Sequence, residues 1–136
     1  MPKVVVFMTR KQAREEAFIL VFEKLFSQSE PDEILDLACE VRDLIPDDYI
    51  KSVFLGVYSK VDEIDEIIST NAIGWKIERI SKTALAVLRL AIFEMKHLDE
   101  IPVSVSINEA VELCKKYATK EDASFVNGIL STVAKS

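Results

Sequence analysis

The sequence of 136 residues is long enough for one domain with a buried core and too short for two domains of ordinary size. Hydrophobic residues make up 49% of the chain and charged residues 29%, a balance typical of globular proteins and not of disordered ones. Only 3 glycines and 4 prolines occur, which favours helices joined by short connections. No apolar run reaches the roughly 18 residues that a membrane span needs, and charged residues follow the short apolar start, which argues against a secretory signal.

Acidic and basic residues are unevenly distributed along the chain. The net charge of −6 at first argues against a nucleic-acid partner. Residues 1–14, however, carry four basic residues and no acidic one, whereas residues 15–70 carry four basic against fifteen acidic residues. Residues 71–136 are nearly balanced, with nine basic and eight acidic residues. The acidity therefore belongs to the second segment, and the amino terminus is locally basic.

Helical periodicity starts at residue 9. Thr9 is a plausible cap for a first helix that runs to about Ser27. Pro31 stands in the first turn of a second helix. The inward-facing apolar stripe of this helix is predicted to be Ile34, Leu37, Ala38, Val41 and Ile45. Asp47 is then predicted to cap one longer helix, whose inward face is Ile50, Val53, Phe54, Val57, Val61, Ile64 and Ile68.

The second half contains the most apolar helix. After a break at residues 71–74 and a short turn, residues 83–98 are apolar nearly all round, which predicts a central, buried helix. Ser106 and Glu109 have the spacing of a capping box and predict the start of the next helix near residue 104 or 106. Asp122 is predicted to cap the last helix. The pattern predicts an all-α, single-domain bundle of about seven helices.

The domain is expected to span residues 9–136. The stretch from Val4 to Phe7 fits a helical plan poorly, and Met8 stands directly before the first helix cap. We therefore expect residues 1–8 to precede the domain as an amino-terminal extension, with Met8 a candidate natural start and residues 1–7 an upstream addition.

Residues able to perform catalysis are few and scattered. The single histidine, His97, ends the central helix, where a positive charge is favoured by the helix dipole. Cys39 and Cys114 match no redox or zinc spacing and are expected to be reduced, packed thiols. Carboxylates between residues 62 and 66 lack the pattern of a calcium loop. We therefore predict a binding protein with no catalytic site, no metal and no cofactor.

Charged residues interrupt the central helix. Arg89 and Glu94 stand among apolar neighbours, so each must be paired or lie at an interface. For Arg89 we favour an ion pair with Glu109 or Glu112 of the following helix over a contact with a partner protein.

The start of the first helix is a candidate anion site. Arg10 and Arg14 lie four residues apart on one helical face, with Lys11 adjacent, at the positive end of the helix dipole. Such a cluster suits a phosphate backbone, although many clusters of this kind are merely solvated helix starts.

Short motifs occur in a defined order between residues 75 and 130. They are Trp75-Lys-Ile-Glu-Arg79, Leu88-Arg-Leu-Ala-Ile-Phe-Glu94, Ile101-Pro102, Ile107-Asn-Glu-Ala-Val-Glu-Leu113 and Phe125-Val-Asn-Gly-Ile-Leu130. In this order and spacing the motifs resemble the NusB family of bacterial transcription antitermination factors, which makes the resemblance specific. Residues 9–136 fit the family's full length.

The resemblance implies two small helical sub-bundles set at an angle. It also implies a cytoplasmic protein that pairs with NusE, a ribosomal small-subunit protein. The pair would bind single-stranded boxA RNA and, within the RNA polymerase antitermination complex, support processive transcription of ribosomal RNA operons. Arg10, Lys11 and Arg14 match the family's basic motif, Gln12 departs from it, and Phe22 matches an aromatic position. The alternative is a helical protein–protein adaptor with little RNA affinity, whose acidic segment binds a basic partner.

Overall fold

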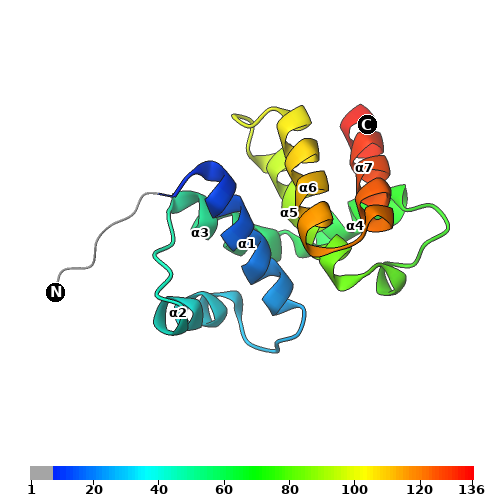
Figure 1. The fold of residues 1–136 in the computed structure, drawn as a ribbon. Helices are drawn as coiled ribbons and strands as arrows, with labels where there is room; N and C mark the ends of the chain where they lie inside the picture. The colour runs from blue at the N-terminus through cyan, green and yellow to red at the C-terminus, as the bar shows by residue number, and fades with distance from the viewer. Residues whose placement is uncertain (1–7) are drawn as a thin grey trace.

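The computed structural model describes residues 8–136, and this part of the chain contains helices and connections but no β-strand (Figure 1). The predicted all-α fold is therefore confirmed. The expectation that residues 1–7 are an upstream addition lies outside the described residues and stays a prediction. The described helices are α1 (Arg10–Lys24), α2 (Pro31–Val41), α3 (Asp48–Ser59), α4 (Val61–Asn71), the 3-10 helix η1 (Ile77–Arg79), α5 (Lys82–His97), α6 (Val103–Tyr117) and α7 (Lys120–Lys135).

The helices form two sub-bundles, as Figure 1 shows. Helices α1, α2 and α3 pack on one another in the amino-terminal sub-bundle, and α4 to α7 form the carboxy-terminal one. Helix α5 contacts α1 and α3 on one side and α4, α6 and α7 on the other. Its buried residues surround the helix, which agrees with the predicted central position. No helix in residues 8–136 is long and apolar enough to cross a membrane.

The start of α1 is fixed by a capping box. The backbone N–H of Gln12 donates to the side chain of Thr9, and the backbone N–H of Thr9 donates to the side chain of Gln12. Gln12, the residue that departs from the family's basic motif, thus has a local structural role. The predicted Thr9 cap is confirmed, and the helix holds Arg10 and Lys11 in its first turn.

The expected long helix after Asp47 is in fact two helices. Lys60 leaves the helical region with φ −116° and ψ 16°, so α3 ends at Ser59 and α4 begins at Val61. The apolar spacing continues across this break, so periodicity alone does not reveal it. Acidic residues in the first turn of α4, where the helix dipole favours them, are the signal that the sequence offers.

Helix α2 is shorter than expected. It ends at Val41, and Asp43 adopts φ 53°, a left-handed conformation that cannot continue the helix. The prediction that Leu37, Val41 and Ile45 face inward was wrong, because these side chains are 58%, 71% and 49% exposed. Within α2 the buried residues are Ile34, Leu35 and Ala38.

Two predicted caps in the second half were also wrong. Helix α6 begins at Val103, and Ser106 is buried in it instead of capping it. In α7, Thr119 is the cap, and its side chain accepts a hydrogen bond from the backbone N–H of Asp122. Both helices therefore begin earlier than their polar residues suggested.

Gly56 lets α3 approach α5 closely. A Cβ atom at this position would lie 2.3 Å from Cζ of Phe93, so no larger residue fits without displacing the ring. The absence of a side chain at Gly56 therefore contributes to the close packing of the two sub-bundles.

Candidate nucleic-acid interface

The three basic residues predicted to bind RNA point in different directions. Arg10 is exposed, and its guanidinium carbon lies 4.5 Å from the centre of the Tyr49 ring on α3. Lys11 extends toward α6, where its Nζ lies 3.3 Å from Oε2 of Glu109. Arg14 turns into the protein and is only 5% exposed. The expected single anion site on one helical face does not form.

Arg14 belongs to a buried polar cluster centred on Glu94. Its Nε donates to Oε2 of Glu94 at 2.7 Å, and its second guanidinium nitrogen donates to Oε1 at 3.3 Å. The hydroxyls of Tyr49 and Ser106 also donate to Glu94, which is 1% exposed. The cluster therefore joins α1, α3, α5 and α6, across both sub-bundles.

The buried charges of this cluster are paired with each other. Burial alone would lower the pKa of Arg14, but the hydrogen bond and negative charge of Glu94 outweigh it and raise the pKa. Burial raises the pKa of Tyr49, and the charge of Glu94 raises it further. Both groups therefore keep their ordinary ionisation state, and the Arg14 charge is neutralised within the protein. With a side-chain exposure of 6%, Arg14 offers little surface to a phosphate outside the protein.

The sequence contained a signal for the burial of Arg14. The residue precedes Ala17 by three positions and Phe18 by four, so it lies on the apolar stripe of α1. The identity of its partner could not be read from that spacing, because Glu94 lies 80 residues further along the chain.

A charged cleft of about 150 Å³ lies between α1 and α6. At one position Lys11 pairs with Glu109, and at another Lys116 Nζ lies 2.6 Å from Oε1 of Glu15. Tyr117 also donates a hydrogen bond to Glu15. The lysine side chains are 67% and 60% exposed, whereas those of Glu109 and Glu15 are 22% and 27% exposed. The ammonium groups thus form the outer layer of this α1–α6 cleft.

A row of aromatic rings continues from the cleft along α1. The ring centres of Phe18 and Tyr117 are 5.1 Å apart, those of Phe18 and Phe22 are 6.2 Å apart, and those of Phe22 and Phe26 are 5.0 Å apart. Phe18 is buried, Phe22 is half-buried, and Tyr117 and Phe26 are 40% and 66% exposed. Of these rings, Phe22 is the one predicted from the sequence to contact RNA.

The row follows from helical spacing. Lys11, Phe18 and Phe22 are separated by seven and four residues, so they share one side of α1, and Phe26 follows in the turn after the helix. Cations and exposed rings therefore occur on the same surface. Exposed aromatic rings beside cations are what single-stranded RNA recognition requires, since bases stack on rings and phosphates pair with cations.

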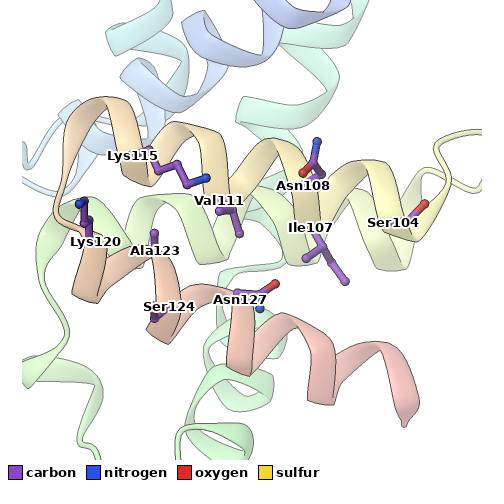
Figure 2. A pocket seen from close by; sticks show the side chains of 9 residues that line it. All are labelled: Ser104, Ile107, Asn108, Val111, Lys115, Lys120, Ala123, Ser124 and Asn127. Atoms are coloured by element: carbon purple, nitrogen blue, oxygen red, sulfur yellow. The ribbon is translucent and has the colours of Figure 1, made fainter.

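A second, wider groove of about 560 Å³ lies between α6 and α7 (Figure 2). Figure 2 shows Ile107 and Val111 of α6 and Ala123 and Asn127 of α7 along it, with α1 on the far side of α6. None of the residues predicted to bind RNA lines this groove. It is separate from the α1–α6 cleft.

Arg89 is paired within the protein, but not with the expected partners. Its Nε and a second guanidinium nitrogen donate to both carboxylate oxygens of Asp65 on α4, at 2.9 and 2.8 Å. The prediction of Glu109 or Glu112 was wrong because α4, as well as α6, packs against α5. Burial alone would lower the pKa of Arg89, and the hydrogen bond and charge of Asp65 raise it instead.

The histidine and the two cysteines of the described residues 8–136 have different local surroundings. His97 Nε2 lies 3.6 Å from Oε1 of Glu63, and its ring lies against Phe93. Cys114 is buried, which raises the pKa of its thiol to about 12, and Cys39 is half-buried and not disulfide-bonded. Within residues 8–136, no group of three or more histidine, cysteine or acidic side chains could hold a metal ion.

These features define a class of protein: an all-helical binding protein whose polar surface combines exposed lysines with aromatic rings. The NusB family model matches residues 11–135. The transcription antitermination protein NusB of Ruminiclostridium cellulolyticum is 45% identical over 130 residues, which cover 94% of this chain and 90% of that protein. The chain therefore belongs to the NusB family.

Solved structures agree with this assignment. A structure of Thermotoga maritima NusB has a TM-score of 0.83 and 31% identity, covering 96% of this chain and 93% of that one. A chain from a crystal structure of the antitermination factors NusB and NusE in complex with double-stranded RNA has a TM-score of 0.83 and 29% identity, covering 93% of this chain and 96% of that one. The two-part helical architecture is thus shared with NusB structures.

Proposed function

We propose that this protein is a transcription antitermination factor that binds boxA-type RNA together with the ribosomal small-subunit protein NusE. In this role it supports processive transcription of ribosomal RNA operons and joins the RNA polymerase antitermination complex indirectly. The observation that carries the proposal is the occurrence of exposed lysines beside a row of aromatic rings along α1 and at the end of α6. Because nascent bacterial RNA is made in the cytoplasm, we infer that the protein acts there, by binding and not by catalysis.

The RNA surface in this proposal consists of Arg10, Lys11 and Phe22. Arg10 and Lys11 are exposed and offer charge to phosphates, and Phe22 offers the edge of an aromatic row to a base. Arg14, matched to the same motif, acts instead through Glu94 by fixing the position of α1. Its contribution to RNA binding is therefore that of a positioning residue.

RNA titrations test this surface. Lys11→Ala should weaken binding of a labelled boxA-type RNA and reduce the salt slope by about 0.7, since one phosphate contact is lost. Phe22→Ala should weaken binding by about 1–3 kcal/mol if one base stacks there. Lys135→Ala, which removes an equal charge at the exposed end of α7, serves as the matched control. RNA binding is measured by fluorescence anisotropy with and without NusE. The surface is misassigned if Lys11→Ala and Phe22→Ala bind RNA as well as Lys135→Ala does.

A second candidate function is a protein–protein adaptor with little RNA affinity of its own. The exposed side of α2 favours it: Leu37 and Val41 are largely exposed among Glu33, Asp36 and Glu40, and no basic residue lies within the helix. Such a surface complements a basic partner with apolar side chains. The adaptor is favoured if the purified protein captures NusE equally well after RNase treatment and RNA adds nothing to the complex.

A further inference from the structure

Both lysines that line the α1–α6 cleft are already paired with carboxylates of the same chain. Lys11 of α1 reaches across to Glu109 of α6, and Lys116 of α6 reaches across to Glu15 of α1. The two ion pairs therefore cross the cleft in opposite directions. A phosphate that binds either lysine must therefore compete with the carboxylate already paired with it.

The carboxylates are the less mobile partners of these pairs. Glu109 and Glu15 are mostly covered, whereas both lysine side chains are mostly exposed. Glu15 also accepts a hydrogen bond from Tyr117, which holds it further. An approaching phosphate thus meets an ammonium group first and a fixed negative charge directly beneath it. Pairing with that phosphate leaves the carboxylate without its partner and close to a like charge.

We propose that Glu109 and Glu15 restrain RNA binding by holding Lys11 and Lys116 in ion pairs that the RNA backbone must replace. The inference rests on the proposed RNA surface and adds the residues that limit its affinity. Intramolecular carboxylates compete with phosphates for the same cations. A structured carboxylate layer of this kind disfavours polyanions that offer charge but no base to the aromatic row.

The restraint changes how the affinity for RNA depends on salt concentration. When an RNA phosphate pairs with Lys11, Glu109 loses its partner and binds small cations from solution. This uptake of cations offsets part of the counterion release that drives RNA binding. Neutralising Glu109 removes this offset. The affinity of a Glu109→Gln protein should therefore exceed that of the unaltered protein most at low salt, and the two should converge as salt rises.

The test uses the full chain and a fluorescein-labelled boxA-type RNA, titrated at several salt concentrations. Glu109→Gln should bind about 2- to 5-fold more tightly at low salt, the range expected for release of an exposed ion pair. Glu66→Gln is the matched control, since it makes the same charge change on an exposed part of α4. In the Lys11→Ala background, Glu109→Gln should have much less effect, because the pair no longer exists.

The outcomes separate the restraint from the RNA surface itself. If Lys11→Ala weakens RNA binding but Glu109→Gln binds RNA like the unaltered protein, the proposed restraint is wrong and the proposed RNA surface is retained. If Glu109→Gln and Glu66→Gln increase the affinity for RNA equally, the effect comes from the change in net charge, and the proposal is overturned. Weaker binding by Glu109→Gln would make Glu109 an RNA contact, which also overturns it. If no RNA binding is measured, or Lys11→Ala leaves it unchanged, the surface itself fails.

Discussion

Two neighbouring positions of α1 use similar cations for opposite purposes. Arg14 and Lys11 are three residues apart, yet their side chains are 6% and 67% exposed. Arg14 is fixed by Glu94 inside the protein. Lys11 pairs with Glu109 but is also exposed to solvent and, in our proposal, binds RNA. The number of basic residues in a motif therefore does not give the number of phosphate contacts.

Exposure also sets the energetic importance of each pair. A buried ion pair is costly to break, because the remaining charge has neither water nor partner. An exposed pair contributes little to stability, because water replaces the lost partner. The pair between Arg89 and Asp65 is intermediate, with side-chain exposures of 12% and 29%. The three pairs thus form a series in which burial should predict the effect of mutation.

The largest effect is expected for Arg14→Met. It leaves Glu94 charged and buried and should lower the free energy of unfolding by about 3–5 kcal/mol, as measured by urea denaturation. Adding Glu94→Gln should restore part of the loss, because the unpaired charge disappears while the Tyr49 and Ser106 hydroxyls keep hydrogen-bond partners.

Two further variants sharpen this test. Arg14→Lys keeps the charge and should lose less stability than Arg14→Met. Lys11→Ala should change the free energy of unfolding by about 1 kcal/mol or less. The contrast between the buried Arg14 and the exposed Lys11 is refuted if Arg14→Met and Lys11→Ala have equal effects.

A smaller effect is expected for Arg89→Met. The loss of two charged hydrogen bonds to Asp65 should lower the free energy of unfolding by about 1.5–3 kcal/mol. A double-mutant cycle with Asp65→Asn should give a coupling of about 1–2 kcal/mol, and a cycle with Glu109→Gln should give none. Additive effects of Arg89→Met and Asp65→Asn would show that the pair is not the source of the loss.

The smallest effect concerns the pH dependence contributed by Glu15. Hydrogen bonds from Lys116 and then Tyr117 lower the pKa of this carboxyl from its ordinary value of 4.5. Since the folded pKa lies below the unfolded one, the stabilisation is complete above pH 4.5 and is lost as pH falls through the folded pKa. The melting temperatures of the unaltered protein and Glu15→Gln should differ by about 2 °C or less at neutral pH and converge in acid. A gap that widens in acid contradicts this assignment.

The sequence by itself determined the fold class and most helices. Local rules suffice for these, because caps such as Thr9, a proline in the first turn such as Pro31, and apolar stripes act within a few residues. The same rules identified α5 as the central helix, since a helix apolar nearly all round must be buried. They also located the basic start of α1 and Phe22 before any contact was known, though their contact with RNA stays a prediction.

Only the tertiary structure decided which charges meet. The partners of Arg14 and Arg89 lie 80 and 24 residues away in sequence, so helix packing, and not local spacing, brings them together. The same holds for Lys11 and Glu109, which are separated by 98 residues. Periodicity shows that a charge is on a buried face and needs a partner. Which partner it finds depends on the relative placement of helices, and this is fixed by packing throughout the core.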